Sequence, residues 1–146
     1  MRTLLKNIGC IQTPVGSHPH RGKEQGENVK YFNAAIAMED GVITEITSDG
    51  KLPEGDFDIE YNAGGNLVTP GLVDGHTHLV FGGYRQHELA MKLAGADYLD
   101  ILKAGGGIID TVRKTREADK SELYIKSAGF LDEMIGMGVT TCEAKS

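Results

Sequence analysis

The stretch PGLVDGHTHLVFGG, residues 70 to 83, marks the point at which the sequence changes from short strands to a strand followed by helices. An apolar run follows the turn residues Pro70 and Gly71, and it ends in His76 and His78, which are one residue apart. Because side chains two positions apart on a strand point to the same face, Asp74, His76 and His78 are expected to share a face. Imidazole is a good ligand for zinc, iron and related divalent metals, so this spacing predicts a pair of metal ligands.

The residues after this stretch predict a series of helices and then a second strand. Apolar spacings of three and four residues, together with capping signals, predict helices over residues 85 to 94, 98 to 104, 106 to 118 and 121 to 137. The β-branched run VTTCEA, residues 139 to 144, predicts the second strand. A strand, helices and a strand form a βαβ unit with a parallel sheet. In barrels built from such units, sites gather at the carboxyl ends of the strands, where the two histidines would lie.

The first 70 residues predict mostly β structure. Short strands are expected at residues 3 to 5, 57 to 61 and 66 to 70, and residues 34 to 47 predict a hairpin around Asp40 and Gly41. The second strand of this hairpin alternates in polarity, which predicts that it is half-buried. Residues 13 to 30 are rich in Gly, Pro and charged side chains, and they predict a long surface loop.

A second pair of histidines with the same spacing, His18 and His20, lies inside that predicted loop. Pro19 separates the two, and no apolar frame surrounds them. Nothing in this segment would hold both rings toward one metal, so a solvated loop is the better interpretation. The spacing alone therefore carries little weight, and the strand around His76 and His78 carries the argument.

Composition limits the classes of function. The chain has 146 residues with 40% hydrophobic and 25% charged residues, which is typical of a soluble globular protein. The net charge of -6 and the lack of a long basic run argue against a nucleic-acid partner. No apolar run approaches the roughly 18 residues that would span a membrane. The two cysteines, Cys10 and Cys142, are far apart and fit a reducing, cytoplasmic location better than a disulfide scaffold.

Several blocks in order resemble known enzymes. PGLVDGHTHL resembles the first-strand signature of the metal-dependent amidohydrolase superfamily. HLVFGGYR, AGADYLDILKAGGGI, TVRKTREA and GVTTCEAKS then resemble the imidazolonepropionase family. The resemblance runs over essentially the whole chain and is strongest from Leu67 to Ser146. Gly75 stands where members of the family often have proline, and residues 13 to 30 do not match a segment of the family.

The resemblance implies an α/β fold in two parts. Residues 1 to 69 would form the N-terminal part of a small composite β-sandwich domain. Residues 70 to 146 would form the start of a (β/α)8 TIM-type barrel, with its first strand, several helices and its second strand. Such a barrel needs roughly 250 residues, so the chain is expected to be truncated relative to the family and unstable by itself.

The resemblance also implies a reaction in histidine degradation, the hydrolysis of the cyclic amide of 4-imidazolone-5-propanoate to N-formimidoyl-L-glutamate. One divalent metal ion, Zn²⁺ or Fe, would activate the water that attacks the ring carbonyl. His76 and His78 match the family's metal ligands, and Arg85 matches its substrate-binding arginine. The remaining ligands and the catalytic base would lie beyond Ser146, so no catalytic residue is assigned within this chain. The partner would be the small-molecule substrate, and the full-length enzyme would be a homodimer.

Two other classes of function stay open at this point. One alternative is another cyclic-amide hydrolase or deaminase of the superfamily, although Arg85 and the AGGGI and TVRKTR blocks favour the imidazolonepropionase family. A non-catalytic metal-binding module of 146 residues is the third reading. Three further features are given minor roles. Asp74 would orient a histidine ring, residues 105 to 107 would break a helix rather than bind phosphate, and His87 would be either a surface or a packing histidine.

Overall fold

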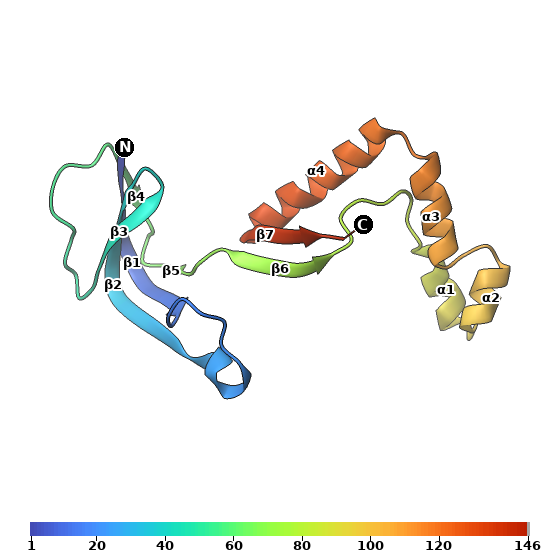
Figure 1. Ribbon diagram of the computed structural model, residues 1–146, viewed down its shortest axis with the longest axis horizontal. Coiled ribbons are helices and arrows are strands. Elements are labelled where there is room, and N and C mark those ends of the chain that lie inside the picture. Colours follow the sequence, from blue (N-terminus) through green and yellow to red (C-terminus); the bar gives the residue numbers. More distant parts are fainter. Residues whose placement is uncertain (146) are drawn as a thin grey trace. The chain divides into compact units, whose positions relative to one another are not determined.

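The computed structural model describes residues 1 to 145 as a mixed α/β chain (Figure 1). The chain divides into two compact units, Met1–Pro70 and Gly71–Ser146. The first unit contains strands and one short 3-10 helix, and the second contains two strands with four helices between them. The sequence therefore predicted the change in secondary structure after residue 70.

The first unit is built on one five-stranded sheet. Its strands are β1 (Arg2–Pro14), β2 (Asn28–Glu39), β3 (Val42–Thr47), β4 (Ile59–Asn62) and β5 (Leu67–Val68), and η1 (Gly22–Gly26) is the 3-10 helix. The order is β3-β2-β1-β4, and β5 also pairs with β1. The β1–β2 and β2–β3 pairs are antiparallel, whereas β4 and β5 run parallel to β1. The core of this unit consists of Ile8, Ile11, Ala34 and Ile36.

The predicted hairpin is confirmed, but the burial of its second strand is not. Asp40 and Gly41 both have positive φ, 49° and 83°, as the two central residues of a type I′ turn require. In β3, the neighbouring residues Val42 and Ile43 are 66% and 55% exposed, so the expected half-buried alternation is wrong. The cause is that β3 lies at the edge of the sheet and that it bulges at Thr44, which shifts its register against β2 between Ala37 and Met38.

The long loop predicted over residues 13 to 30 is shorter than expected, because strands occupy both of its ends. β1 extends from Arg2 to Pro14, far beyond the predicted residues 3 to 5, and β2 already begins at Asn28. The full length of β1 could not be predicted from the sequence, because the pairing of β1 with β2 shifts between Leu5 and Ile8, where Asn7 adopts a φ of 56°. This irregularity breaks the alternation by which a strand is recognised.

The second unit is a parallel two-stranded sheet with helices between its strands. β6 (Leu72–Thr77) pairs with β7 (Val139–Ala144), as predicted. The four helices are α1 (His87–Leu93), α2 (Tyr98–Lys103), α3 (Ile108–Glu117) and α4 (Lys120–Gly136). The cap predicted for α2 is present, because Asp97 accepts a hydrogen bond from the backbone N–H of Asp100 at 2.8 Å. These elements confirm the βαβ prediction.

Helix α4 packs through a different face from the one that its apolar spacing suggests. Tyr124 and Ile135 belong to the apolar residues that recur at spacings of three and four along this helix, but they are 75% and 65% exposed. The side chain of Ser127 is buried instead, and its hydroxyl donates a hydrogen bond to the carbonyl of Leu79 at 3.3 Å. Phe130, one turn along the same face, stacks against Phe81 at 6.0 Å between ring centroids. This face holds α4 against the segment that follows β6.

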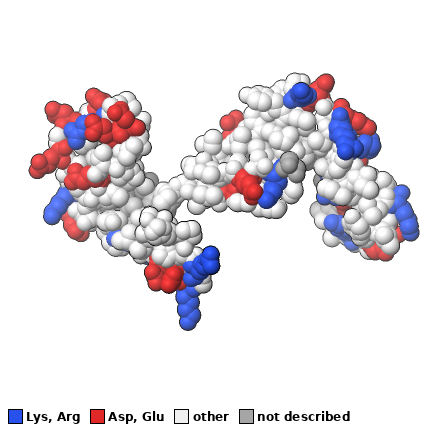
Figure 2. Space-filling view, in the orientation of Figure 1, with Lys and Arg blue, Asp and Glu red and all other residues white. Residues whose placement is uncertain are grey.

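The surface carries charges of both signs. On the face shown in Figure 2, acidic side chains gather at the end of the first unit that holds the N-terminus and β4. Within residues 1 to 145, no helix has the length and apolar character needed to cross a membrane.

Candidate metal and substrate site

The two histidines of the central motif lie side by side at the carboxyl end of β6. Their ring centroids are 5.2 Å apart, and the ring planes meet at 73°. His76 lies within β6, and His78 is the first residue after Thr77, the last residue of the strand. Both side chains are exposed. The spacing therefore brings two imidazoles together where both are open to a ligand.

The local backbone is less regular than the strand prediction assumed. The β6–β7 register passes from Asp74 opposite Cys142 to Thr77 opposite Ala144, so β6 carries one additional residue there. The carboxylate of Asp74 accepts a hydrogen bond from the backbone N–H of His76 at 3.0 Å. This bond lowers the pKa of the Asp74 carboxyl. Asp74 thus fixes the backbone that carries the first histidine, whereas the sequence had suggested a contact with a ring.

The pair of imidazoles suits a divalent metal in the chemistry of its donors. Neutral imidazole nitrogen is a common ligand of zinc and iron. Within residues 1 to 145, however, no group of three or more His, Cys, Asp or Glu side chains is placed to hold a metal ion. The described residues therefore fit a metal as two of its ligands, and a full coordination shell needs further donors.

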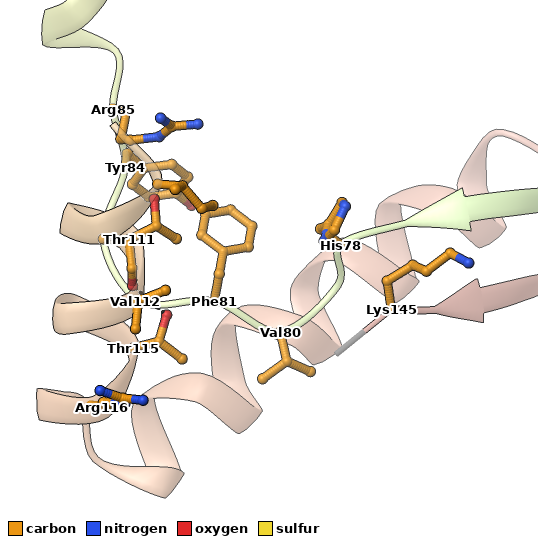
Figure 3. A pocket seen from close by; sticks show the side chains of 12 residues that line it. His78, Val80, Phe81, Tyr84, Arg85, Thr111, Val112, Thr115, Arg116 and Lys145 are labelled. Atoms are coloured by element: carbon orange, nitrogen blue, oxygen red, sulfur yellow. Dashed lines mark hydrogen bonds between the residues drawn. The ribbon is translucent and has the colours of Figure 1, made fainter. Parts of the chain in front are cut away.

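An open pocket of about 830 Å³ lies beside His78. The segment after β6 provides one wall with Tyr84 and Arg85, and α3 provides another with Thr111 and Arg116 (Figure 3). Lys145, which follows β7, also lines the pocket. Three cationic side chains therefore surround this pocket, and they favour an anionic ligand.

Arg85, the predicted substrate-binding residue, lines the same pocket as His78. Its guanidinium lies 3.5 Å from the carboxylate of Glu88, whose side chain is buried. The other oxygen of Glu88 accepts a hydrogen bond from the backbone N–H of Gly107 at 2.6 Å. Sequence reasoning did not single out Glu88, although an acid three residues after an arginine on a helix is a recognisable pairing signal.

The segment between His78 and Arg85 approaches α3 very closely at Gly82. The backbone N–H of Gly82 donates a hydrogen bond to the hydroxyl of Thr115 at 2.8 Å. A Cβ atom at Gly82 would lie 2.4 Å from the carbonyl oxygen of Lys114, so only glycine fits here without a shift. Gly82 is thus the point at which this segment contacts α3.

His20, His87 and the glycines at residues 105 to 107, which were given no part in the site, have local structural roles. The Nε2 atom of His20 lies 2.7 Å from the carbonyl oxygen of Val15, within its own loop. His87 is exposed on α1. Gly105 and Gly107 have φ values of 81° and 78°, and they lie between α2 and α3. The expected helix break is therefore confirmed.

No family model matches the chain. It is 46% identical over 99% of its length to imidazolonepropionases of Streptococcus pyogenes, among them those of serotype M49 (strain NZ131), serotype M3 (strain SSI-1) and serotype M1. The chain covers 34% of the length of these relatives, so it spans about a third of a curated imidazolonepropionase.

Proposed function

We infer that this chain corresponds to an N-terminal portion of an imidazolonepropionase, and we propose that it contributes two metal ligands and a substrate-binding arginine to that enzyme's active site. The observation that carries the proposal is the position of His78 and Arg85 on one pocket at the carboxyl end of β6, in a chain that is 46% identical to these enzymes. The activity is proposed for the whole protein, of which these residues form one part.

The proposed fold of the whole protein is a (β/α)8 barrel with a small β-sandwich domain beside it. In this proposal, β6 and β7 are the first two barrel strands, and the sheet of the first unit belongs to the sandwich. The parallel pairing of β6 with β7, with four helices between them, supports the barrel. The position of the two histidines after the carboxyl end of β6 agrees with the usual place of barrel active sites.

The proposed reaction is the hydrolysis of 4-imidazolone-5-propanoate. Water adds to the ring carbonyl, the bond from that carbon to the ring nitrogen breaks, and the nitrogen takes up a proton to give N-formimidoyl-L-glutamate. A bound divalent ion, zinc or iron, would polarise the carbonyl and lower the pKa of its water to about 7. His76 and His78 would hold this ion through neutral imidazole nitrogens.

Arg85 is proposed to bind the propionate carboxylate of the substrate. A guanidinium presents two parallel N–H donors to a carboxylate, and the bidentate pair fixes both the position and the orientation of the ligand. Lys145 and Arg116 line the same pocket and add to its attraction for an anion. This arrangement would direct the propionate arm of the substrate toward Arg85 and place its imidazolone ring near the metal held by His76 and His78.

The test uses the full-length protein loaded with zinc or iron and supplied with 4-imidazolone-5-propanoate. We expect metal-dependent formation of N-formimidoyl-L-glutamate. Arg85→Met should raise KM by about 10- to 100-fold, because a charge-assisted hydrogen bond contributes about 1.5–3 kcal/mol. Arg21→Met, in the loop of the first unit, is the matched control and should leave KM unchanged. Absence of turnover by the loaded wild-type protein would refute the proposed function, and an unchanged KM for Arg85→Met would refute the role of Arg85.

A further inference from the structure

Lys126 lies on α4, yet its ammonium contacts the segment that leads from the histidines to Arg85. Its Nζ atom donates hydrogen bonds to the carbonyl oxygens of Phe81 and Gly83, at 3.1 and 2.9 Å. These partners are 45 and 43 residues away in the sequence. The side chain therefore joins the helix to two nearly adjacent carbonyl groups of the loop.

The same ammonium is enclosed by aromatic rings. It lies 3.6 Å from the ring centroid of Phe81, 3.8 Å from that of Tyr84 and 5.7 Å from that of Phe130. Phe81 and Tyr84 meet edge to face at 5.8 Å, so the two rings support each other around the cation. A partly desolvated cation over two rings contributes more than an exposed one.

The electrostatic surroundings of Lys126 are unusual for a lysine. Burial lowers the pKa of its ammonium. Among residues 1 to 145, no carboxylate forms an ion pair with it. Carbonyl dipoles and ring faces thus provide the compensation for desolvation that a carboxylate commonly gives. All of these compensating carbonyls and the two nearest rings belong to one loop, residues 81 to 84.

This loop forms part of the wall of the pocket and leads directly into Arg85. Phe81, Tyr84 and Arg85 all line the pocket. The loop is held by α3, through the bond from Gly82 to Thr115, and by α4, through Lys126. Removal of the ammonium would leave the bond from Gly82 to Thr115 and the stacking of Phe81 on Phe130, and neither of these contacts binds the carbonyl groups of Phe81 and Gly83.

We propose that Lys126 is a positioning residue whose enclosed ammonium fixes the loop of residues 81 to 84 and thereby sets the place of Arg85 in the pocket. The part that concerns Arg85 and the substrate carboxylate rests on the proposed function, whereas the fixing of the loop does not. A purely structural lysine would stabilise α4 as a whole. The packing of α4 through Ser127 and Phe130 does not involve the ammonium, so its loss should act on the loop first.

The experiment compares the full-length protein with three variants. Lys126→Met keeps an apolar side chain of similar length, Lys126→Arg keeps the positive charge, and Lys120→Met removes an exposed lysine at the start of the same helix. Hydrogen exchange of the peptide that covers residues 79 to 86 reports on the loop. Steady-state kinetics with 4-imidazolone-5-propanoate and the bound metal content report on the site.

For Lys126→Met we expect faster exchange in residues 79 to 86 and a KM raised about tenfold, the lower end of the loss expected when one hydrogen bond to a charged group disappears. Its kcat should change by less than about threefold and its metal content should not change, because the histidines are held by β6. Lys126→Arg should restore both exchange and KM, and Lys120→Met should match the wild type. If Lys126→Met does not accumulate, Lys126→Gln removes the charge and serves in its place.

If residues 79 to 86 of Lys126→Met, or of Lys126→Gln in its place, exchange hydrogen at the same rate as in the wild type, the proposal is wrong. Faster exchange with an unchanged KM would overturn the link to Arg85, and so would failure of Lys126→Arg to restore KM. If the loaded wild-type protein does not turn over the substrate, the proposed function fails, and the exchange data alone then decide whether Lys126 fixes the loop. The two failures are therefore distinguishable.

Discussion

At the scale of single residues, His76 and His78 lie side by side, as two ligands of the proposed metal site would. The ring centroids are 5.2 Å apart, and both side chains are exposed. Because neither ring is buried, both can rotate toward one ion without exposing further apolar surface. Asp74 holds the backbone N–H of His76, which restricts the conformations available to that histidine. A ligand whose backbone is already fixed loses less entropy when it binds a metal.

Replacement of either histidine tests this role. In the full-length protein, His76→Ala and His78→Ala should each lower the amount of metal retained after dialysis and abolish turnover, because a site that loses one imidazole loses a direct metal bond. Metal analysis and kinetics are the measurements. His20→Ala is the control, since it alters the other pair with the same spacing and should change neither quantity. Full metal content and full activity in His76→Ala would contradict the assignment.

The residue scale also shows what the sequence could and could not predict. The proximity of the two histidines follows from their spacing, but the additional residue in β6 and the bond from Asp74 to the backbone do not. The contacts of Lys126 could not be predicted, because its partners are more than 40 residues away in the sequence. A lysine on a helix is ordinarily solvated, and only the folded chain brings aromatic rings around this one.

At the scale of elements, the approach of the loop to α3 depends on Gly82. Gly82→Ala would place a Cβ atom 2.4 Å from the carbonyl oxygen of Lys114, so the loop or the helix must move. We expect a loss of about 1–3 kcal/mol in the free energy of unfolding, as in other overpacked sites, measured by urea denaturation of the full-length protein.

Gly129→Ala is the matched control for this change. Gly129 lies on the exposed side of α4, and no atom lies within 4 Å of the Cβ that alanine would add. Alanine is favoured over glycine within a helix by about 1 kcal/mol, so this variant should be as stable as the wild type or more stable. Equal stability of the two alanine variants would show that the close approach to α3 has no energetic consequence.

The first turn of α3 gives a prediction about pH. The buried carboxylate of Asp110 pairs with Lys114 at 2.7 Å and with Arg113 at 2.6 Å. The bond from Lys114 and, after it, that from Arg113 lower the pKa of Asp110 below its usual value. A carboxyl whose pKa is lower in the folded protein contributes stability above its unfolded pKa of about 3.9, and this contribution disappears as the pH falls through the folded pKa.

Asp110→Asn should therefore be less stable than the wild type at pH 7, and the difference should shrink at about pH 3 and below. Chemical denaturation of both proteins at several pH values measures this difference in the free energy of unfolding. A difference that stays constant or grows as the pH falls would mean that the two ion pairs do not stabilise the helix.

The elements themselves were predicted unequally well, for physical reasons. The four helices and β7 follow from local signals, such as the Asp97 cap and the β-branched run at residues 139 to 144. The long strand β1 was missed because Asn7 and a register shift interrupt its alternation. The packing face of α4 was also missed, because it depends on the loop after β6, which contributes Phe81 and the carbonyl of Leu79.

At the scale of the whole molecule, the second unit leaves large apolar side chains exposed on its sheet and helices. Val73 on β6 is 72% exposed, Ile109 on α3 is 70% exposed and Ile125 on α4 is 70% exposed. Within the described residues, β6 and β7 pair only with each other, so each strand also has one edge without a partner. Exposed apolar surface and open strand edges are both sites of association.

The 146-residue chain on its own should therefore bind a dye that is specific for apolar surfaces and should associate as its concentration rises. Sedimentation velocity over a range of concentrations measures the association, and dye fluorescence measures the exposed apolar surface. Val73→Lys should reduce the association, because a charge on an open strand discourages pairing between chains. A monomer with a cooperative melt and a well-dispersed NMR spectrum would contradict this prediction and would favour a self-contained binding module. The proposed enzyme instead requires further chain to cover these apolar faces, and that same chain would supply the remaining metal ligands.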